Sequence, residues 1–459
     1  MKFYDRDSEL KYLDKVFKAS KKRSQMLVLF GRRRIGKTSL IEEFLKKRKG
    51  INFFVEVKDE KLLLEELESA ISVINPKVTP VFKDFDDFFE YLFNYLGKQK
   101  DPFIFAFDEI QNFNRTVPGF YSIMQKHWDK YSNDSRLMMI CVGSYIGMMK
   151  RIFTDAKEPL FGRAEHTINL KKFGFKDTVD ILLDKGVKDP KRIIELYGTM
   201  DGIPKYLRYM DIFWKGNLWN FINDLFYEDI APLREEGKNV LVQEFGSVNA
   251  AYFSILEAIA RGKCVPKEIA DKTGLNINTV NKYLHDLTTY YGITERRYPI
   301  TEDPFKSRNV RYFLKDNFYR FWFRFVYSHS GDLEGLKKEF DNYLSGIFED
   351  ICIEKIKIDF KFKEVGKWWT RTFEVDILAI DKNSALIGEC KWSNKKMDLG
   401  DFFKLKDKSE NLPLKDAMFR YALFSKNGFT ERLKNMAPEE DISLYDLEKI
   451  CFTKKDEVN

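Results

Sequence analysis

The stretch Gly31-Arg32-Arg33-Arg34-Ile35-Gly36-Lys37-Thr38 decides how the N-terminal part of the chain can fold. It fits the phosphate-binding pattern G-x-x-x-x-G-K-[ST] at every fixed position. Residues 26–30 are all apolar and predict a buried strand, and residues 39–47 predict a helix with one apolar side. The two glycines allow consecutive backbone amides to converge on a phosphate at the start of that helix. The order of strand, loop and helix favours a nucleotide site over a chance glycine turn.

The residues of this loop have predicted roles. Lys37 would reach the β- and γ-phosphates of ATP, and the Thr38 hydroxyl would bind Mg²⁺. ATP and Mg²⁺ are therefore the expected cofactors. The expected nucleotide-binding residues are Gly31, Arg32, Arg33, Arg34, Ile35, Gly36, Lys37, Thr38 and Ser39.

A second acidic motif follows about 70 residues later. The apolar run 103–107 predicts a strand that ends in Asp108 and Glu109. Asp108 would hold the Mg²⁺ shell, and Glu109 would polarise the attacking water. Many strands end in acids by chance, but the complete phosphate loop upstream favours the catalytic interpretation.

Composition sets outer bounds on the protein. The 459 residues predict roughly two to four domains. A net charge of +7 permits contact with nucleic acid without requiring it. The five cysteines are scattered singly, which predicts neither disulfides nor a structural zinc site. No apolar run approaches the roughly 18 residues of a membrane span, and the first residues lack a signal peptide's apolar core, so we expect a cytoplasmic protein without a membrane partner.

Residues 250–287 have the spacing of a helix-turn-helix. Helices are predicted over 250–259, 267–273 and 276–287, with Gly274 in the turn between the last two. Two short strands follow, over 293–300 and 311–314, and predict a β-wing.

Polar and basic side chains of this region suggest contact with DNA. The outer face of the last helix would carry Thr279, Asn281, Lys282 and His285. Together with Lys282, the wing residues Arg296, Arg297 and Arg311 would contact phosphates. The alternative, that such a region packs internally or binds protein, stays open.

The C-terminal third contains a second candidate site. Strands are predicted over 372–380 and 385–392, after a helix over 340–355 that carries Glu349. Glu389 and Lys391 are two residues apart and point to one face, and the neighbouring strand can bring Asp376 beside them. Such a group would ligate a hard cation and steady a water or a developing phosphate charge.

Several motifs together resemble the archaeal ATPase family, a branch of the AAA+/STAND-like P-loop NTPases. They are the phosphate loop, Phe-Asp-Glu-Ile-Gln at 107–111, Pro-Leu-Phe-Gly-Arg at 159–163 and Gly-Ile-Pro-Lys-Tyr-Leu at 202–207. The resemblance covers nearly the whole chain and implies an ATPase core, a small helical lid, a winged helix and a nuclease-like C-terminal domain. Asp201 departs from it, because a second glycine is expected there.

The resemblance also implies two sensors of the γ-phosphate. Ser144, at the end of a strand over 137–143, would lie between water and γ-phosphate, and Arg163 would bring a guanidinium from the same or a neighbouring subunit. Ser144 could instead begin a helix, and Arg163 could lie in solvent.

Asp376, Glu389 and Lys391 match the order Asp … Glu-x-Lys of the PD-(D/E)XK nuclease fold, and Glu349 matches the helical acid often found upstream. Three interpretations stay open: an active nuclease, a retained fold without activity, and a polar sheet face that alternates by chance. Predicted catalytic residues are therefore Lys37, Asp108, Glu109, Ser144, Arg163, Glu349, Asp376, Glu389 and Lys391, and predicted metal ligands are Thr38, Asp108, Asp376 and Glu389.

The predicted fold is α/β: a P-loop NTPase parallel sheet with a helical lid, a winged helix-turn-helix and a restriction-endonuclease-like domain. The expected boundaries are 1–172, 173–245, 246–316 and 317–459. We expect a Mg²⁺-dependent ATPase that couples hydrolysis to DNA binding and to DNA cleavage. The alternative is an ATP-gated switch that binds DNA or protein, with an inactive nuclease-like domain. Homo-oligomers or a protein partner are compatible with both.

Overall fold

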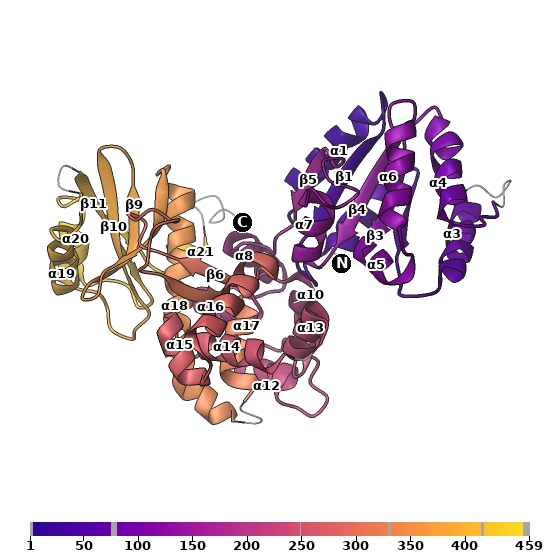
Figure 1. Ribbon diagram of the computed structural model, residues 1–459. Coiled ribbons are helices and arrows are strands. Elements are labelled where there is room, and N and C mark those ends of the chain that lie inside the picture. The colour runs from indigo at the N-terminus through magenta and orange to yellow at the C-terminus, as the bar shows by residue number, and fades with distance from the viewer. Residues whose placement is uncertain (1–2, 75–79, 248, 329–331, 415–416, 453–459) are drawn as a thin grey trace. The chain divides into compact units, whose positions relative to one another are not determined.

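The computed structural model describes residues 3–74, 80–247, 249–328, 332–414 and 417–452. The chain divides into two compact units (Figure 1). The first unit contains Met1–Lys172 with the short segments Ile203–Lys205 and Thr289–Gly292, and the second contains Phe173–Gly202, Tyr206–Thr288 and Ile293–Asn459. Within the described ranges, no helix combines the length and the apolar character that a membrane crossing requires.

The first unit is built on a parallel sheet of five strands in the order β2-β3-β4-β1-β5. The strands are β1 (Gln25–Phe30), β2 (Gly50–Phe54), β3 (Phe103–Asp108), β4 (Leu137–Gly143) and β5 (His166–Asn169). Because all five run in the same direction, their carboxyl ends meet at one edge. The phosphate loop after β1, the acids ending β3 and Ser144 after β4 therefore share that edge.

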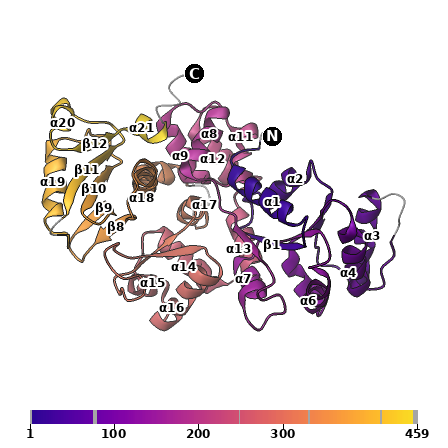
Figure 2. The ribbon, with the colours of Figure 1, turned by 90° about the horizontal axis from the view of Figure 1, so that it is seen from above.

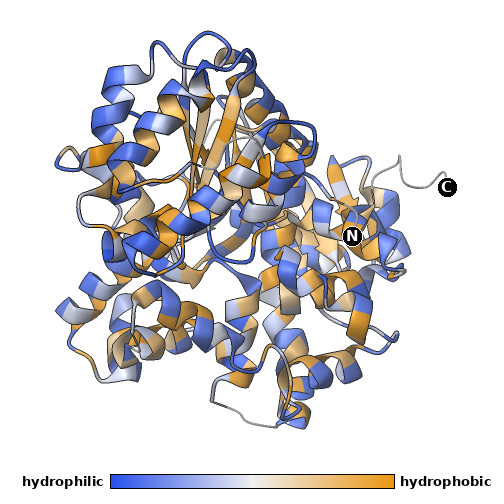
Figure 3. Ribbon diagram, turned by 90° about the vertical axis from the view of Figure 1, so that its right-hand side faces the viewer, coloured by the Kyte–Doolittle hydropathy of each residue, from blue (hydrophilic) through white to orange (hydrophobic). Residues whose placement is uncertain are grey.

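Helices cover both faces of this sheet (Figure 1). They are α1 (Asp7–Ala19), α2 (Lys37–Leu45), α3 (Glu60–Ile74), α4 (Phe85–Asn94), α5 (Phe113–Thr116), α6 (Phe120–Tyr131) and α7 (Ile146–Thr154), with short turns η1 (Leu96–Lys98) and η2 (Ile110–Asn112). Alternate residues of β1 enter different cores: Leu27 and Leu29 pack with α1 and α2, whereas Met26 and Val28 pack with α3, α4 and α6. The central strands β1, β3 and β4 are buried at every position and are predominantly hydrophobic (Figure 3).

The second unit begins with a group of helices. They are α8 (Phe175–Asp184), α9 (Pro190–Met200), α10 (Pro204–Leu207), α11 (Met210–Phe213), α12 (Leu218–Phe226) and α13 (Glu236–Phe245), with Pro204 and Lys205 of α10 grouped in the first unit. Asp201, at the end of α9, adopts a φ of 60°. Its carboxylate accepts the N–H of Asn317 at 2.8 Å, which explains why an aspartate stands where the resemblance implied a glycine.

Three helices and a two-stranded antiparallel sheet follow. They are α14 (Ala250–Ala260), α15 (Pro266–Thr273), α16 (Ile277–His285), β6 (Thr294–Arg297) and β7 (Arg311–Leu314), with η3 (Asp286–Tyr290) after α16. Next come α17 (Asn317–Phe321) and η4 (Trp322–Val326). Their aromatic side chains are buried up to Phe325, whereas Tyr327, which follows η4, is 40% exposed.

The C-terminal part of this unit is a mixed sheet in the order β12-β11-β10-β9-β8. Its elements are α18 (Leu333–Asp359), β8 (Glu364–Trp369), β9 (Glu374–Ile380), β10 (Ser384–Lys391), α19 (Leu399–Ser409), β11 (Met418–Ser425), α20 (Glu431–Met436), β12 (Ile442–Tyr445) and α21 (Leu447–Cys451). Strands β10, β11 and β12 are parallel, and β8 and β9 are antiparallel additions. Figure 2 shows α18 on one side of the sheet and α19 and α20 on the other.

A β-bulge interrupts the pairing of β8 with β9. Gly366 pairs with Leu378 and Trp368 with Val375, so one residue of β8, Lys367, lies opposite two residues of β9. Those two residues are Asp376 and Ile377. A bulge re-aims side chains at the point where it occurs, and here it occurs at the predicted catalytic aspartate.

The architecture confirms the predicted α/β fold with a P-loop NTPase parallel sheet, and the C-terminal part, predicted as restriction-endonuclease-like, contains a mixed sheet.

Candidate nucleotide and carboxylate sites

The phosphate loop connects β1 to α2 in the conformation that the glycines permit. A Cβ at Gly31 would lie 2.3 Å from the Leu170 carbonyl oxygen, so no side chain fits there. Gly36 has a φ of 90° and precedes the first residue of α2, Lys37. The Lys37 ammonium is directed into the loop, where it donates to the carbonyl oxygens of Gly31 at 2.8 Å and Arg32 at 3.0 Å. The loop therefore holds the Lys37 ammonium among its own carbonyl oxygens.

Thr38 and Asp108 lie in direct contact. The Thr38 hydroxyl donates to Oδ2 of Asp108 at 2.6 Å. Burial raises the pKa of Asp108, and the Thr38 hydrogen bond opposes that rise. Mg²⁺ in NTPase sites binds through one or two protein oxygens together with phosphates and waters. A hydroxyl and a carboxylate side by side fit that requirement.

Glu109 is held beside Asp108 in a strained conformation. Its φ of 60° is left-handed, which is uncommon outside glycine. Its Oε2 accepts the Ser144 hydroxyl at 2.7 Å and the side-chain amide of Gln111. The predicted base and the predicted polar sensor therefore contact each other directly. Gln111 is a site residue to which the sequence analysis gave no role, although it stands in the quoted motif.

Arginines near the loop have partners of their own. Arg33 donates to the Tyr145 hydroxyl at 2.8 Å and lies over that ring, so Tyr145 joins the loop. Arg6, ahead of α1, donates to the carbonyl oxygens of Ile35 at 3.3 Å and Lys171 at 2.8 Å.

Arg163 is engaged with its own surroundings. It forms a two-point ion pair with Asp129, at 2.7 and 2.9 Å, and donates to the carbonyl oxygens of Pro159 and Phe161. In this conformation Arg163 is committed to its own loop and to α6.

The predicted C-terminal carboxylates gather around the bulge. Oδ2 of Asp376 accepts the N–H of Cys390 at 2.9 Å. Burial and the negative charges of Glu349 and Glu389 raise the pKa of Asp376 to about 7. The structure therefore brings these three acids close enough to repel one another, although they come from α18, β9 and β10.

Lysines neutralise the other two acids. Lys367, opposite the bulge on β8, forms an ion pair with Glu349, and Lys408 of α19 forms one with Glu389 at 2.8 Å. Lys391 forms an ion pair with Asp401 of α19. Lys367, which pairs with Glu349, also opposes the rise in the pKa of Asp376. This lysine had no predicted role.

The metal fit differs between the two sites. In the described ranges, no three His, Cys, Asp or Glu side chains are grouped to hold a metal ion. Thr38 and Asp108 do not need such a group, as argued above. At the C-terminal site the acids would have to supply the ligands themselves, and two of them are occupied by ammonium groups. The arrangement described is therefore an ionic network and does not fit a bound cation.

The basic residues predicted for the wing are mostly engaged within the second unit. Arg297 pairs with Asp350 at 2.6 Å, and Arg311 pairs with Glu374 at 3.0 Å. Arg296 donates to two carbonyl oxygens of the β6–β7 loop. On α16, by contrast, Asn281, Lys282 and His285 are exposed, whereas Thr279 is half-buried. The predicted phosphate contacts of the three arginines are thus not available in this conformation.

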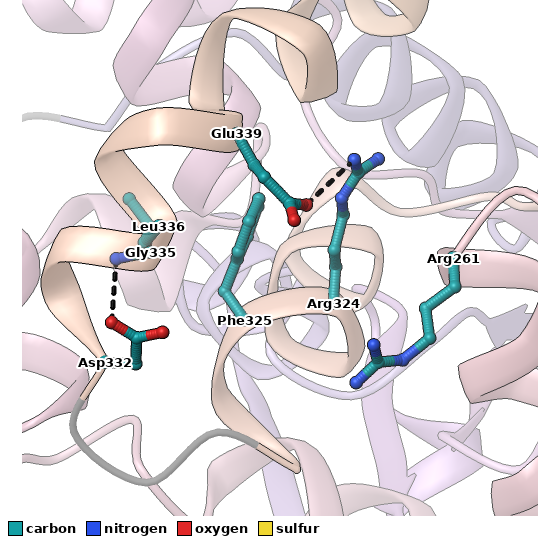
Figure 4. Close-up of a pocket in the computed structure, with 7 residues that line it drawn as sticks. All are labelled: Arg261, Arg324, Phe325, Asp332, Gly335, Leu336 and Glu339. Atoms are coloured by element: carbon teal, nitrogen blue, oxygen red, sulfur yellow. Dashed lines mark hydrogen bonds and ion pairs between the residues drawn. The ribbon is translucent and has the colours of Figure 1, made fainter.

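A cavity of about 210 Å³ lies elsewhere in the second unit, near the start of α18 (Figure 4). Its charged groups are already paired: Arg324 with Glu339 at 3.2 Å, and Arg261 with Glu257 at 3.0 Å. Asp332 caps α18 by accepting the N–H of Gly335 at 2.7 Å. These contacts hold the local helices together.

Two stretches of the chain match known families. Residues 3–210 match a family described as an ATPase domain predominantly from Archaea. Residues 322–401 match a family of archaeal and bacterial proteins of unknown function. The second match includes Glu349, Lys367, Asp376, Glu389 and Lys391.

The comparison with solved structures found a shared fold in an archaeal ATPase. A Walker-type ATPase of Pyrococcus abyssi aligns at a TM-score of 0.54 and 21% identity, covering 70% of this chain and 96% of its own. The ORC2 protein of Aeropyrum pernix, solved as ADPNP–ADP complexes, aligns at a TM-score of 0.47 and 12% identity, covering 75% of this chain and 94% of its own.

One curated relative matches from end to end. The uncharacterized protein MJECL04 of Methanocaldococcus jannaschii is 30% identical over 464 residues, which cover 97% of this chain and 99% of the relative. With its phosphate loop, its acidic strand end and its matched ATPase domain, the chain belongs with this relative to the family of archaeal ATPases.

Proposed function

We propose that the chain hydrolyses ATP at the edge of the β1–β3–β4 sheet and uses the nucleotide cycle to control binding of duplex DNA by the second unit. The observation that carries the ATPase part is the contact between the Thr38 hydroxyl and Asp108, 2.6 Å apart beside the phosphate loop. Mg²⁺ bound there would supply neutralisation of phosphate charge. Lys37 would release the carbonyl oxygens of its loop to bind the β- and γ-phosphates.

Glu109 and Ser144 would act on the attacking water. Glu109 accepts hydrogen bonds from Ser144 and Gln111, so two side-chain donors hold its carboxylate. Release from Ser144 would let Glu109 orient a water in line with the γ-phosphate. Arg163 stays a candidate sensor in the same or a neighbouring subunit, and either role would require breaking its pair with Asp129.

The DNA part rests on α16 and its surroundings. Three helices followed by a two-stranded sheet have the order of a winged helix, and α16 presents Asn281, Lys282 and His285 to solvent. An exposed face with amide, ammonium and imidazole donors suits phosphates and base edges.

Turnover and DNA binding of the full-length protein test this proposal together. Lys37→Ala should abolish ATP hydrolysis while the protein stays folded, and the exposed Lys47→Ala on the following turn is its matched control. Duplex affinity of the wild type should differ between ATP and ADP, and Lys37→Ala should remove that difference. Near-wild-type turnover in Lys37→Ala would refute the ATPase assignment. Equal duplex affinity in ATP and ADP would refute the coupling.

A second candidate function is DNA cleavage by the Asp376 cluster. The bulge favours it, because it directs Asp376 toward two further acids at an electrostatic cost that a purely structural sheet would avoid. The lysine pairs oppose it, so we derive no catalytic step at this site. Glu349, Asp376, Glu389 and Lys391 stay candidate catalytic residues, with Lys367 added to them.

Supercoiled DNA incubated with the protein and Mg²⁺ or Mn²⁺, with and without ATP, decides between cleavage and the non-cleaving switch. Cleavage that Asp376→Ala abolishes supports a nuclease. Comparing Lys367→Met with Lys391→Met then identifies the lysine that matters. Intact DNA, with ATP turnover retained, supports the switch, and equal cutting by Asp376→Ala would assign the cleavage to another site or a contaminant.

A further inference from the structure

The loop between β6 and β7 (residues 298–310) exposes a large aromatic side chain at its tip. Phe305 is 95% exposed. A single exposed apolar residue needs no explanation by itself. The tip, which we define as residues 303–308, is nevertheless held in one conformation by a specific set of hydrogen bonds.

Arg296 supplies the central part of that set. One end of its guanidinium donates to the carbonyl oxygen of Pro304 at 2.6 Å, and the other donates to that of Ser307 at 2.9 Å. These two residues flank Phe305 and Lys306. A planar guanidinium that binds both sides of a turn fixes the segment between them. Because its guanidinium is used in this way, Arg296 is not available to contact phosphates.

Backbone hydrogen bonds complete the turn. Oδ1 of Asp303 accepts the N–H of Phe305 at 2.8 Å, and the Asp303 carbonyl oxygen accepts the N–H of Ser307 at 2.9 Å. The tip therefore presents Phe305 outward on an ordered turn, so little conformational entropy remains to be lost when it binds.

The base of the loop is anchored to the edge strand β8. The N–H of Ile300 donates to the Lys367 carbonyl oxygen at 3.2 Å, and the Asn309 side chain donates to that of Trp369 at 3.2 Å. Asn309 also accepts the indole N–H of Trp369 at 2.9 Å. The loop is thus fixed at both ends of its base, while its tip extends beyond these contacts.

Charge distribution in this region indicates the chemistry of the partner. The arginines on the strands, Arg297 and Arg311, are paired with carboxylates. At the tip, Lys306 and Arg308 are exposed, and within the described ranges neither side chain has a hydrogen bond or ion pair. Two unneutralised cations beside an outward-facing aromatic ring suit a polyanion with stacked rings.

We propose that the tip is a wedge for duplex DNA: Phe305 inserts between base pairs from the minor groove, and Lys306 and Arg308 contact the flanking phosphates. Arg296 is a positioning residue that holds the wedge in shape. This inference rests on the proposed DNA binding by α16 and identifies a second contact for it.

Binding of the full-length protein to a short duplex that contains 2-aminopurine tests the wedge. Fluorescence anisotropy measures affinity, and 2-aminopurine emission rises when its base is unstacked. Phe305→Ala should lose about tenfold in affinity and abolish the rise in emission. Ile230→Ala is the matched control, because Ile230 is 94% exposed in the same unit, and it should change neither quantity.

The cations and the clamp have separate signatures. The double variant Lys306→Ala/Arg308→Ala should reduce the slope of log affinity against log salt by about 2, whereas Arg432→Ala, exposed on α20, should leave it unchanged. Arg296→Lys keeps the charge but cannot hold two carbonyl groups in a fork. It should therefore abolish the 2-aminopurine signal as Phe305→Ala does, and circular dichroism checks that each variant is folded.

The failure of the wedge differs from the failure of DNA binding. Full affinity and full emission in Phe305→Ala, with binding lost in Lys282→Ala, would overturn the wedge and leave DNA binding by α16 intact. Normal emission in Arg296→Lys would overturn the clamp. Absence of duplex binding by the wild type would overturn both the wedge and the proposed DNA function.

Discussion

The two carboxylate sites of this chain follow the same rule in sequence and differ in their partners. In each, an apolar strand carries an acidic residue at or near its carboxyl end: Asp108 ends β3, and Glu389 lies near the end of β10. At the edge of the first sheet, Asp108 and Glu109 accept hydrogen bonds from the hydroxyl groups of Thr38 and Ser144. In the second unit, Glu349 and Glu389 form ion pairs with the ammonium groups of Lys367 and Lys408.

The difference shows that the partner of a carboxylate decides whether the carboxylate can bind a cation. A hydroxyl hydrogen-bonds to a carboxylate without cancelling its charge, so the negative potential of Asp108 persists for Mg²⁺ and phosphate. An ammonium cancels the charge, so a cation at Glu349 or Glu389 must displace a lysine first. The first site is arranged for a ligand, and the second is neutralised by its own side chains.

The largest expected effect comes from removing the hydroxyl at the first site. Thr38→Val keeps the side-chain volume but removes the oxygen that binds Mg²⁺, so ATP turnover should fall about a thousandfold. Thr38→Ser keeps the oxygen and should retain most of the activity. Steady-state phosphate release measures both variants. Equal activity of valine and serine at this position would show that the hydroxyl contact is structural only.

Removing an ammonium from the second site should affect stability. Lys367→Met leaves Glu349 without its partner beside Asp376, which should destabilise the second unit by about 3 kcal/mol. Adding Glu349→Gln should restore most of this loss. Urea unfolding measures each change, with the exposed Lys363→Met as control. An unchanged free energy of unfolding in Lys367→Met would mean that the ion pair does not form.

A smaller effect is expected at Ser144. Ser144→Ala frees Glu109 from one of its donors but also removes the proposed sensor, so turnover should fall about thirtyfold. The exposed Ser122→Ala in the same unit should have no effect. An increase in turnover would instead identify Ser144 as a brake on Glu109.

The smallest effect, taken per pH unit, comes from the titration of Asp376. Asp376 has a folded pKa of about 7, above its usual value of 3.8, so the folded state retains a proton that the unfolded state loses. Stability should therefore fall between about pH 4 and pH 7, by at most about 1.4 kcal/mol per pH unit. Asp376→Asn should flatten this dependence, measured by urea unfolding across that range. Exposed Asp407→Asn should not, and an unchanged slope in Asp376→Asn would show that another group titrates.

Local motifs were predictable from the sequence, and long-range partners were not. The phosphate loop, the end of β3 and the positions of Glu389 and Lys391 on one strand follow from spacing alone. Lys367 was missed because only the bulge, a property of strand pairing, brings it opposite Asp376.

The wing arginines were predicted to be available for phosphates, and here too the sequence did not reveal their partners. Arg296, Arg297 and Arg311 looked like phosphate contacts, because a sequence shows charge but not whether that charge is already paired. Their partners Pro304, Asp350 and Glu374 lie in a loop, a helix and a strand that no local pattern connects to them. Asp201, likewise, could be understood only once its bond to Asn317 was seen.

The Asp201–Asn317 bond also bears on the order in which the chain is made. Helix α9 is completed by groups far ahead of it: the Tyr343 hydroxyl donates to the Gly198 carbonyl oxygen at 2.6 Å, and Cys451 contacts the Pro190 carbonyl oxygen. On the ribosome, residues 190–201 can pack on α8 as soon as they are made, but their remaining contacts must wait for the last part of the chain. A fragment that stops after β7 would remove the contacts of this helix with Asn317, Tyr343 and Cys451, so shortening the protein from its C-terminus weakens the segment that directly follows the ATPase core.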